Sequence, residues 1–93
     1  MLPLPAGCAV EVWYRVDKIT TPFTTDSGFT TDADGWIQAE QPDNQGARLT
    51  TANTQRADFK IAEICRVIEV MVKLFPYQNL TPDISEVNVY FDV

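Results

Sequence analysis

The chain of 93 residues contains no histidine. Histidine is the side chain that proteins use most often as a general acid or base, and it is the commonest protein ligand of metal ions. Its absence, together with only two cysteines, excludes an ordinary zinc site. The sequence also has no glycine-rich phosphate loop and no nucleophile elbow around Ser27 or Ser85. We therefore expect no cofactor and no enzymatic activity.

Cysteine is also scarce, with Cys8 and Cys65 as the only two. Two cysteines are too few for a disulfide-rich scaffold. A free cysteine in a protein interior behaves as a small apolar residue. We interpret both as buried apolar side chains, with a bridge between them as the alternative.

Long apolar runs are missing as well. Nowhere do 18 apolar residues follow one another, so no membrane-spanning segment and no membrane partner is predicted. The first residues have neither the basic region nor the apolar run of a secretory signal, and residues 1–7 are interpreted as an extended lead-in. A chain of this length has the size of one domain. We expect a single soluble domain over residues 1–93 in the cytoplasm.

Positive charge is outnumbered, with 7 Lys and Arg residues against 13 Asp and Glu residues and a net charge of −6. No basic residue falls between Ile19 and Ala47. Five carboxylates in that interval form a predicted acidic patch: Asp26, Asp32, Asp34, Glu40 and Asp43. Nucleic-acid binding requires clustered positive charge, so we expect no nucleic-acid partner.

Alternation of apolar and polar residues predicts several β-strands. It is clearest after Cys8, where valines alternate with charged and aromatic residues. Asp32 and Gly35 bound a predicted hairpin turn, because Asp can accept hydrogen bonds from its own backbone and Gly tolerates a positive φ. The predicted strands are Cys8–Ile19, Trp36–Glu40, Ile84–Val93 and a shorter one within Arg48–Thr51.

The segment from about Thr54 to Phe75 is predicted to be one long helix, ended by Pro76. Apolar residues recur there at intervals of three and four: Ala57, Ile61, Ile64, Ile68, Met71 and Phe75. The sequence therefore predicts an α+β fold. One long helix (about 54–75) packs on one face of a mainly antiparallel sheet of three to five strands, in the order β-β-β-(β)-α-β.

One segment gives a weak indication of a metal site. Thr30, Asp32 and Asp34 alternate like the oxygen ligands of an EF-hand calcium loop, with Gly35 at its turn. Gln41 stands where such a loop needs a bidentate glutamate, and the flanking segments are predicted strands rather than helices. The simpler interpretation is an acidic hairpin turn, and no metal site is predicted.

Two sets of apolar residues are interface candidates. One set extends the apolar arc of the predicted helix beyond what a single sheet face covers, so it needs a loop or another subunit against it. The other set consists of aromatic residues predicted on the outer face of the sheet, where they suit a protein partner. The candidates are Val67, Val70 and Leu74 in the first set, and Trp13, Trp36 and Tyr90 in the second.

The leading hypothesis is a small acidic, non-catalytic protein-interaction domain that forms a homodimer, binds another protein, or does both. One alternative is an acidic inhibitor or nucleic-acid mimic that masks a basic surface of a partner, a kind of protein common among phage and mobile-element genes. Another is a small-molecule-binding or enzymatic module with a cavity between the helix and the sheet.

Overall fold

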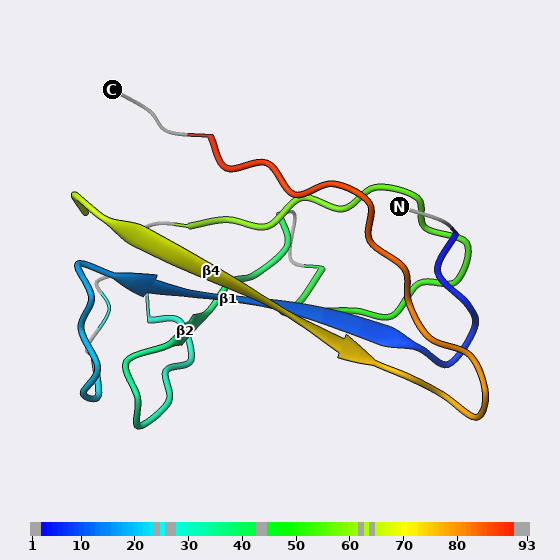
Figure 1. Cartoon of the computed structure of the whole chain (residues 1–93), viewed down its shortest axis with the longest axis horizontal. Coiled ribbons are helices and arrows are strands. Elements are labelled where there is room, and N and C mark those ends of the chain that lie inside the picture. The colour runs from blue at the N-terminus through cyan, green and yellow to red at the C-terminus, as the bar shows by residue number, and fades with distance from the viewer. Residues whose placement is uncertain are drawn as a thin grey trace.

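The computed structural model of the chain describes residues 3–23, 25, 28–42, 45–61, 63 and 65–90 (Figure 1). In this part of the chain the regular elements are four β-strands. Two of them are long and two are short. The strands are β1 (Ala9–Val16), β2 (Ile37–Gln38), β3 (Arg48–Leu49) and β4 (Ile68–Phe75).

Every other strand of the sheet pairs antiparallel with β1. Strand β4 pairs with β1 over eight residues, from Ala9 opposite Phe75 to Val16 opposite Ile68. Strands β2 and β3 share the opposite edge of β1, with β2 near its end and β3 near its start. Strand β1 is therefore central, and β4 forms one side of the sheet by itself.

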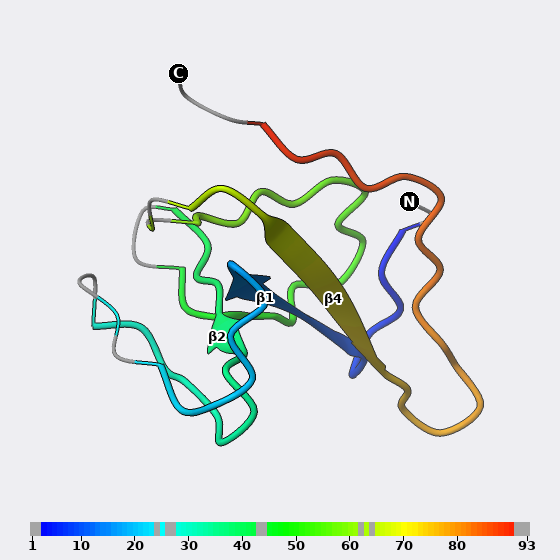
Figure 2. The ribbon, with the colours of Figure 1, turned by 60° about the vertical axis from the view of Figure 1, so that its left-hand side comes forward.

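One face of the β1–β4 pair carries the core. Its even-numbered residues contribute to two buried clusters, one around Val10 and Leu49 and the other around Tyr14 and Ile37. The side chain of Phe59 packs against both clusters and so connects them. Figure 2 shows that much of the chain outside the β1–β4 pair is irregular, and residues of these irregular segments cover the core.

The predicted helix over about residues 54–75 is wrong, because residues 68–75 form β4 and no helix occurs among the described residues before it. The residues from Ile68 to Leu74 satisfy a second pattern, in which β-branched and other apolar residues alternate with Glu69, Met71 and Lys73. β-branched side chains favour a pleated strand over a helix. The eight-residue ladder with β1 supplies the hydrogen bonds that a helix would have made within itself.

The predicted C-terminal strand over Ile84–Val93 is also absent as far as Tyr90, and residues 91–93 lie outside the described part of the chain. Strand β4 takes the position beside β1, so the predicted order β-β-β-(β)-α-β becomes four strands in chain order. No helix in the described residues is long and apolar enough to cross a membrane.

The segment at the start of the chain contributes to the core. The side chain of Leu4 is buried, and its backbone exchanges hydrogen bonds with Asn53 and Thr54. Cys8 is buried and Cys65 is partly buried, and the two are not bridged to each other. Burial raises the pKa of the Cys65 thiol, which keeps the thiol in its neutral form.

Candidate interaction surfaces

The outer edge of β4 is the first candidate site, since no described residue pairs with it. The amide of Asp17 donates a hydrogen bond to the carbonyl of Val67 at 2.8 Å. Val67 stands opposite Asp17 in the register of β4 and β1, so its backbone groups point toward β1. The bond from the amide of Ala39 to the carbonyl of Val12, also at 2.8 Å, fixes the same alternation on the other edge of β1. Backbone groups in an antiparallel ladder point to alternate sides along a strand. The odd residues of β4 therefore bond to β1, and the even ones direct their N–H and C=O groups outward: Ile68, Val70, Val72 and Leu74.

Apolar side chains flank this edge. Leu74 at one end of β4 is 40% exposed, and Val67 just before the other end is 43% exposed. Val70, in the middle, is half-buried. The three interface candidates predicted on a helix thus lie along or beside the outer edge of a strand.

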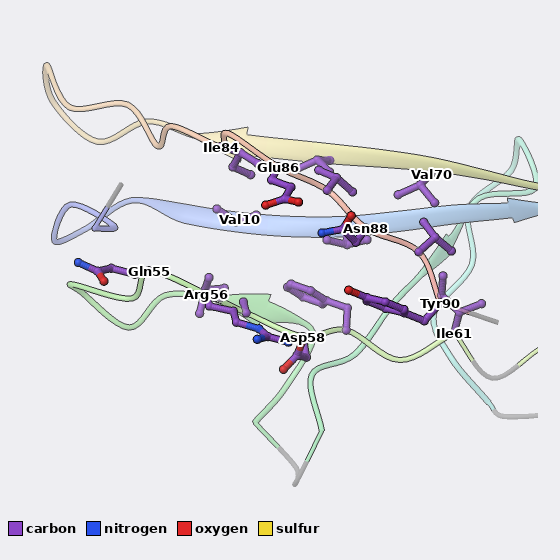
Figure 3. A pocket seen from close by; sticks show the side chains of 17 residues that line it. Val10, Gln55, Arg56, Asp58, Ile61, Val70, Ile84, Glu86, Asn88 and Tyr90 are labelled. Atoms are coloured by element: carbon purple, nitrogen blue, oxygen red, sulfur yellow. Dashed lines mark ion pairs between the residues drawn. The ribbon is translucent and has the colours of Figure 1, made fainter. Parts of the chain in front are cut away.

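A groove crosses the apolar face of the β1–β4 pair (Figure 3). It has a volume of about 480 Å³ and lies between the strands, the segment 55–61 and the segment 84–90. Its floor is apolar, with Val10 and Val70 among the lining residues, and Glu86 and Asn88 extend from the C-terminal segment. Polar and charged side chains line its rim, among them Arg56, Asp58 and Glu86.

The opposite face of the sheet carries charged and aromatic side chains. Arg15 lies 4.6 Å above the ring of Trp36, and Lys73 lies 4.5 Å above the ring of Trp13. Trp13 is only 9% exposed, whereas Tyr90 lines the groove and is 85% exposed. The three aromatic candidates therefore do not form one patch, because Trp13 and Trp36 lie on the charged face and Tyr90 lies on the other side.

A bidentate ion pair joins β1 to β4 on the charged face. The Nη2 atom of Arg15 lies 2.8 Å from Glu69 Oε2, and its Nε donates to Oε1 at 3.1 Å. This hydrogen bonding lowers the pKa of Glu69 and raises that of Arg15, since each charge favours the ionised form of the other. Neither residue was a candidate at the sequence level, although the pair stands directly opposite in the register.

The predicted acidic patch is not a single uncompensated surface in the described part of the chain. Oδ1 of Asp32 accepts hydrogen bonds at 2.9 Å from the amides of Asp34 and Trp36, so this carboxylate caps the turn. Asp34 and Asp32 are both close enough to Arg15 to help raise its pKa. Glu40 is exposed elsewhere, on a backbone bridge to Lys60. Asp26 and Asp43 lie outside the described residues.

The calcium-binding hypothesis concerns the same hairpin. The carbonyl of Thr30 accepts a hydrogen bond at 2.7 Å from the amide of Gln38, which places it in the hairpin backbone. Among the described residues, no three or more His, Cys, Asp or Glu side chains are grouped so that they could hold a metal ion. Thr30 and Asp32 each accept backbone hydrogen bonds within the hairpin.

Sequence reasoning missed Asp17, which joins the end of β1 to the start of β4. Its Oδ1 accepts hydrogen bonds from the amides of Arg66 and Val67, at 2.8 and 3.1 Å. No sequence pattern indicates these partners, because they are distant in the chain.

Comparisons of the whole chain with protein-family models, curated proteins and solved structures find no match.

Proposed function

We propose that this chain is a non-catalytic protein-interaction domain that binds an extended partner strand along the outer edge of β4. The observation that carries the proposal is the eight-residue length of β4, paired on one side only in the described structure. Four of its residues direct backbone donors and acceptors outward. A peptide that adds to such an edge gains main-chain hydrogen bonds, and the neighbouring side chains provide specificity.

The character of the edge supports this proposal. Proteins commonly protect exposed edges with prolines, bulges, charged residues or very short strands. Strand β4 has no proline, pairs with β1 in an unbroken register, and is as long as the central strand. Its one lysine, Lys73, is drawn over the ring of Trp13. The edge therefore keeps the features that favour strand addition.

Two earlier expectations belong with this proposal. The sequence predicts a cytoplasmic location, and we propose that location for this interaction domain. The alternative of an acidic inhibitor stays a prediction, because two of its five carboxylates lie outside the described residues.

Selection of random peptides on sparsely immobilised protein tests the proposal. Peptides that bind should alternate apolar and polar residues, and in amide hydrogen-exchange measurements they should slow the exchange of Ile68, Val70, Val72 and Leu74. Leu74→Pro removes one outward donor, so it should weaken binding. Val87→Ser, on the groove, is the matched control and should leave binding unchanged. If peptide affinity is unchanged by Leu74→Pro but falls with Val87→Ser, the peptides bind in the groove and the proposal is overturned.

A further inference from the structure

We infer that the strand bound at this edge is β4 of a second copy of the chain, antiparallel and centred on Met71. The inference rests on the proposed function of the β4 edge and specifies its partner. It follows from two properties of β4, namely which backbone groups point outward and where its two charges lie.

The backbone limits the possible registers. Only the even residues of β4 have outward N–H and C=O groups, so even residues must pair with even residues across a two-fold axis. The axis must then pass through a residue of β4 and not between two residues. Five centres remain within the central part of the strand, from Glu69 to Lys73.

The charges distinguish among these five centres. A centre at Met71 places Glu69 of each copy opposite Lys73 of the other, which makes two symmetric pairs of opposite charge. A centre at Glu69 or at Lys73 places like charges opposite each other. A centre at Val70 or Val72 leaves both charges opposite uncharged residues. Only the register centred on Met71 is therefore self-complementary in charge.

Glu69 and Lys73 also occupy the closer kind of cross-strand position in this register. The odd residues would form non-hydrogen-bonded pairs between the copies, in which opposing Cα atoms are only about 4.5 Å apart. The Glu69 carboxylate is bound by Arg15 but its side chain keeps 37% of its surface exposed. Lys73 takes part in no ion pair among the described residues, and its ammonium group is held over Trp13.

The apolar face continues across the same axis. Val70 would stand opposite Val72 of the second copy, and Ile68 opposite Leu74, so apolar residues face apolar residues throughout. This arrangement would cover Leu74, which is 40% exposed in the single chain. Two four-stranded sheets would then become one continuous antiparallel sheet with β1 inside each half.

Charge reversal tests the partner and the register together. Lys73→Glu and Glu69→Lys each place two like-charge pairs across the axis, so each should weaken dimerisation at least about tenfold. An equimolar mixture of the two variants should restore the dimer, because positions 69 and 73 then carry opposite charges in both pairs across the axis. Lys60→Glu is the control, since Lys60 lies beside Glu40 on the other side of β1, and its dimer should be unchanged. Size-exclusion chromatography with light scattering measures each case.

Cysteine cross-linking tests the register without depending on the charged variants. In a Cys65→Ser background, Met71→Cys should form an intermolecular disulfide under mild oxidation, because the two residues meet at the axis. Glu69→Cys in the same background should not. Cross-linking at position 69 would overturn the inference. A dimer that neither charge reversal weakens would also overturn it, and would point to another interface, such as one formed by exchange of the 84–90 segments.

A wild-type chain that stays monomeric at the highest concentration reached also overturns it. That result leaves the proposed function to be decided by the peptide experiment, in which slowed exchange of the outward amides of β4 would still support an edge that binds other strands. If the chain neither dimerises nor binds peptides that slow exchange of the outward amides of β4, both proposals are overturned.

Discussion

Asp17 shows how a single exposed residue can join two strands. Its φ of 49° and that of Lys18, 58°, turn the chain sharply after β1. Its carboxylate then accepts hydrogen bonds from the amides of Arg66 and Val67, just before β4 begins. These backbone hydrogen bonds lower the pKa of Asp17, because they stabilise the ionised carboxylate.

The stability of the protein should depend on pH through Asp17. The folded-state pKa lies below the ordinary value, so the contribution of this carboxylate is present above the unfolded-state pKa. It is lost as the pH falls through the lower, folded-state pKa. Asp17→Ala should reduce the urea midpoint at neutral pH, and the difference from wild type should shrink in strong acid. Asp17→Asn keeps an acceptor oxygen without the charge, so it should fall between the two. An Asp17→Ala difference that is constant with pH would contradict the assignment.

Local chemistry made the hairpin turn predictable, and distance made Asp17 unpredictable. Asp32 accepts hydrogen bonds from amides two and four residues further along, and Gly35 adopts a φ of 87°. Both features depend on neighbouring residues only, so a short sequence pattern predicts them. The partners of Asp17 lie 49 and 50 residues further along the chain. Nothing in the residues around Asp17 specifies which segment returns to it.

At the scale of the element, alternation located β1 correctly, within the predicted Cys8–Ile19, but it competed with another pattern in β4. Between residues 54 and 75 the apolar residues fit both a helical stripe and, near the end, a strand. The enrichment in valine and isoleucine from Val67 to Val72 favours the strand. A periodicity argument alone could not choose, because the pairing partner of β4 lies far away in sequence.

The alternation of backbone groups along β4 gives a test at neighbouring positions. In the monomeric chain the outward donor of Leu74 has no partner strand, so at dilute, monomeric concentrations Leu74→Pro should change the free energy of unfolding by no more than about 1 kcal/mol. Lys73→Pro removes a donor that points toward β1 and leaves its acceptor there without a partner, so it should cost about 1–3 kcal/mol more than Leu74→Pro. Urea unfolding of the two variants measures both values. Equal costs, or a larger cost at Leu74, would contradict the assigned directions.

At the scale of the whole molecule, Phe59 holds two small clusters together as one core. A chain of 93 residues buries a modest share of its surface, so stability depends on few large side chains. The position of Phe59 in the core depends on the complete fold, and no local pattern identified it.

Phe59→Ala should therefore destabilise the entire sheet in one transition. We expect a cost of roughly 2–3 kcal/mol, since the side chain is only partly buried, and a fall in the thermal midpoint of roughly 15 °C. Val87→Ala is the control, because Val87 is 56% exposed, and its effect should stay within about 0.5 kcal/mol. Calorimetry that resolves two transitions in Phe59→Ala would indicate that the clusters unfold separately.

The central position of β1 also has a consequence in time. All three partners of β1 follow it in the chain, and β4 begins about fifty residues after β1 ends. During synthesis, β1 must therefore leave the ribosome long before the strand that pairs with its full length has been made. Closing so long a loop slows folding, and an unpaired strand rich in valine is prone to aggregate in the interval. A newly made chain is thus most exposed to misassembly between the emergence of its first strand and that of its last.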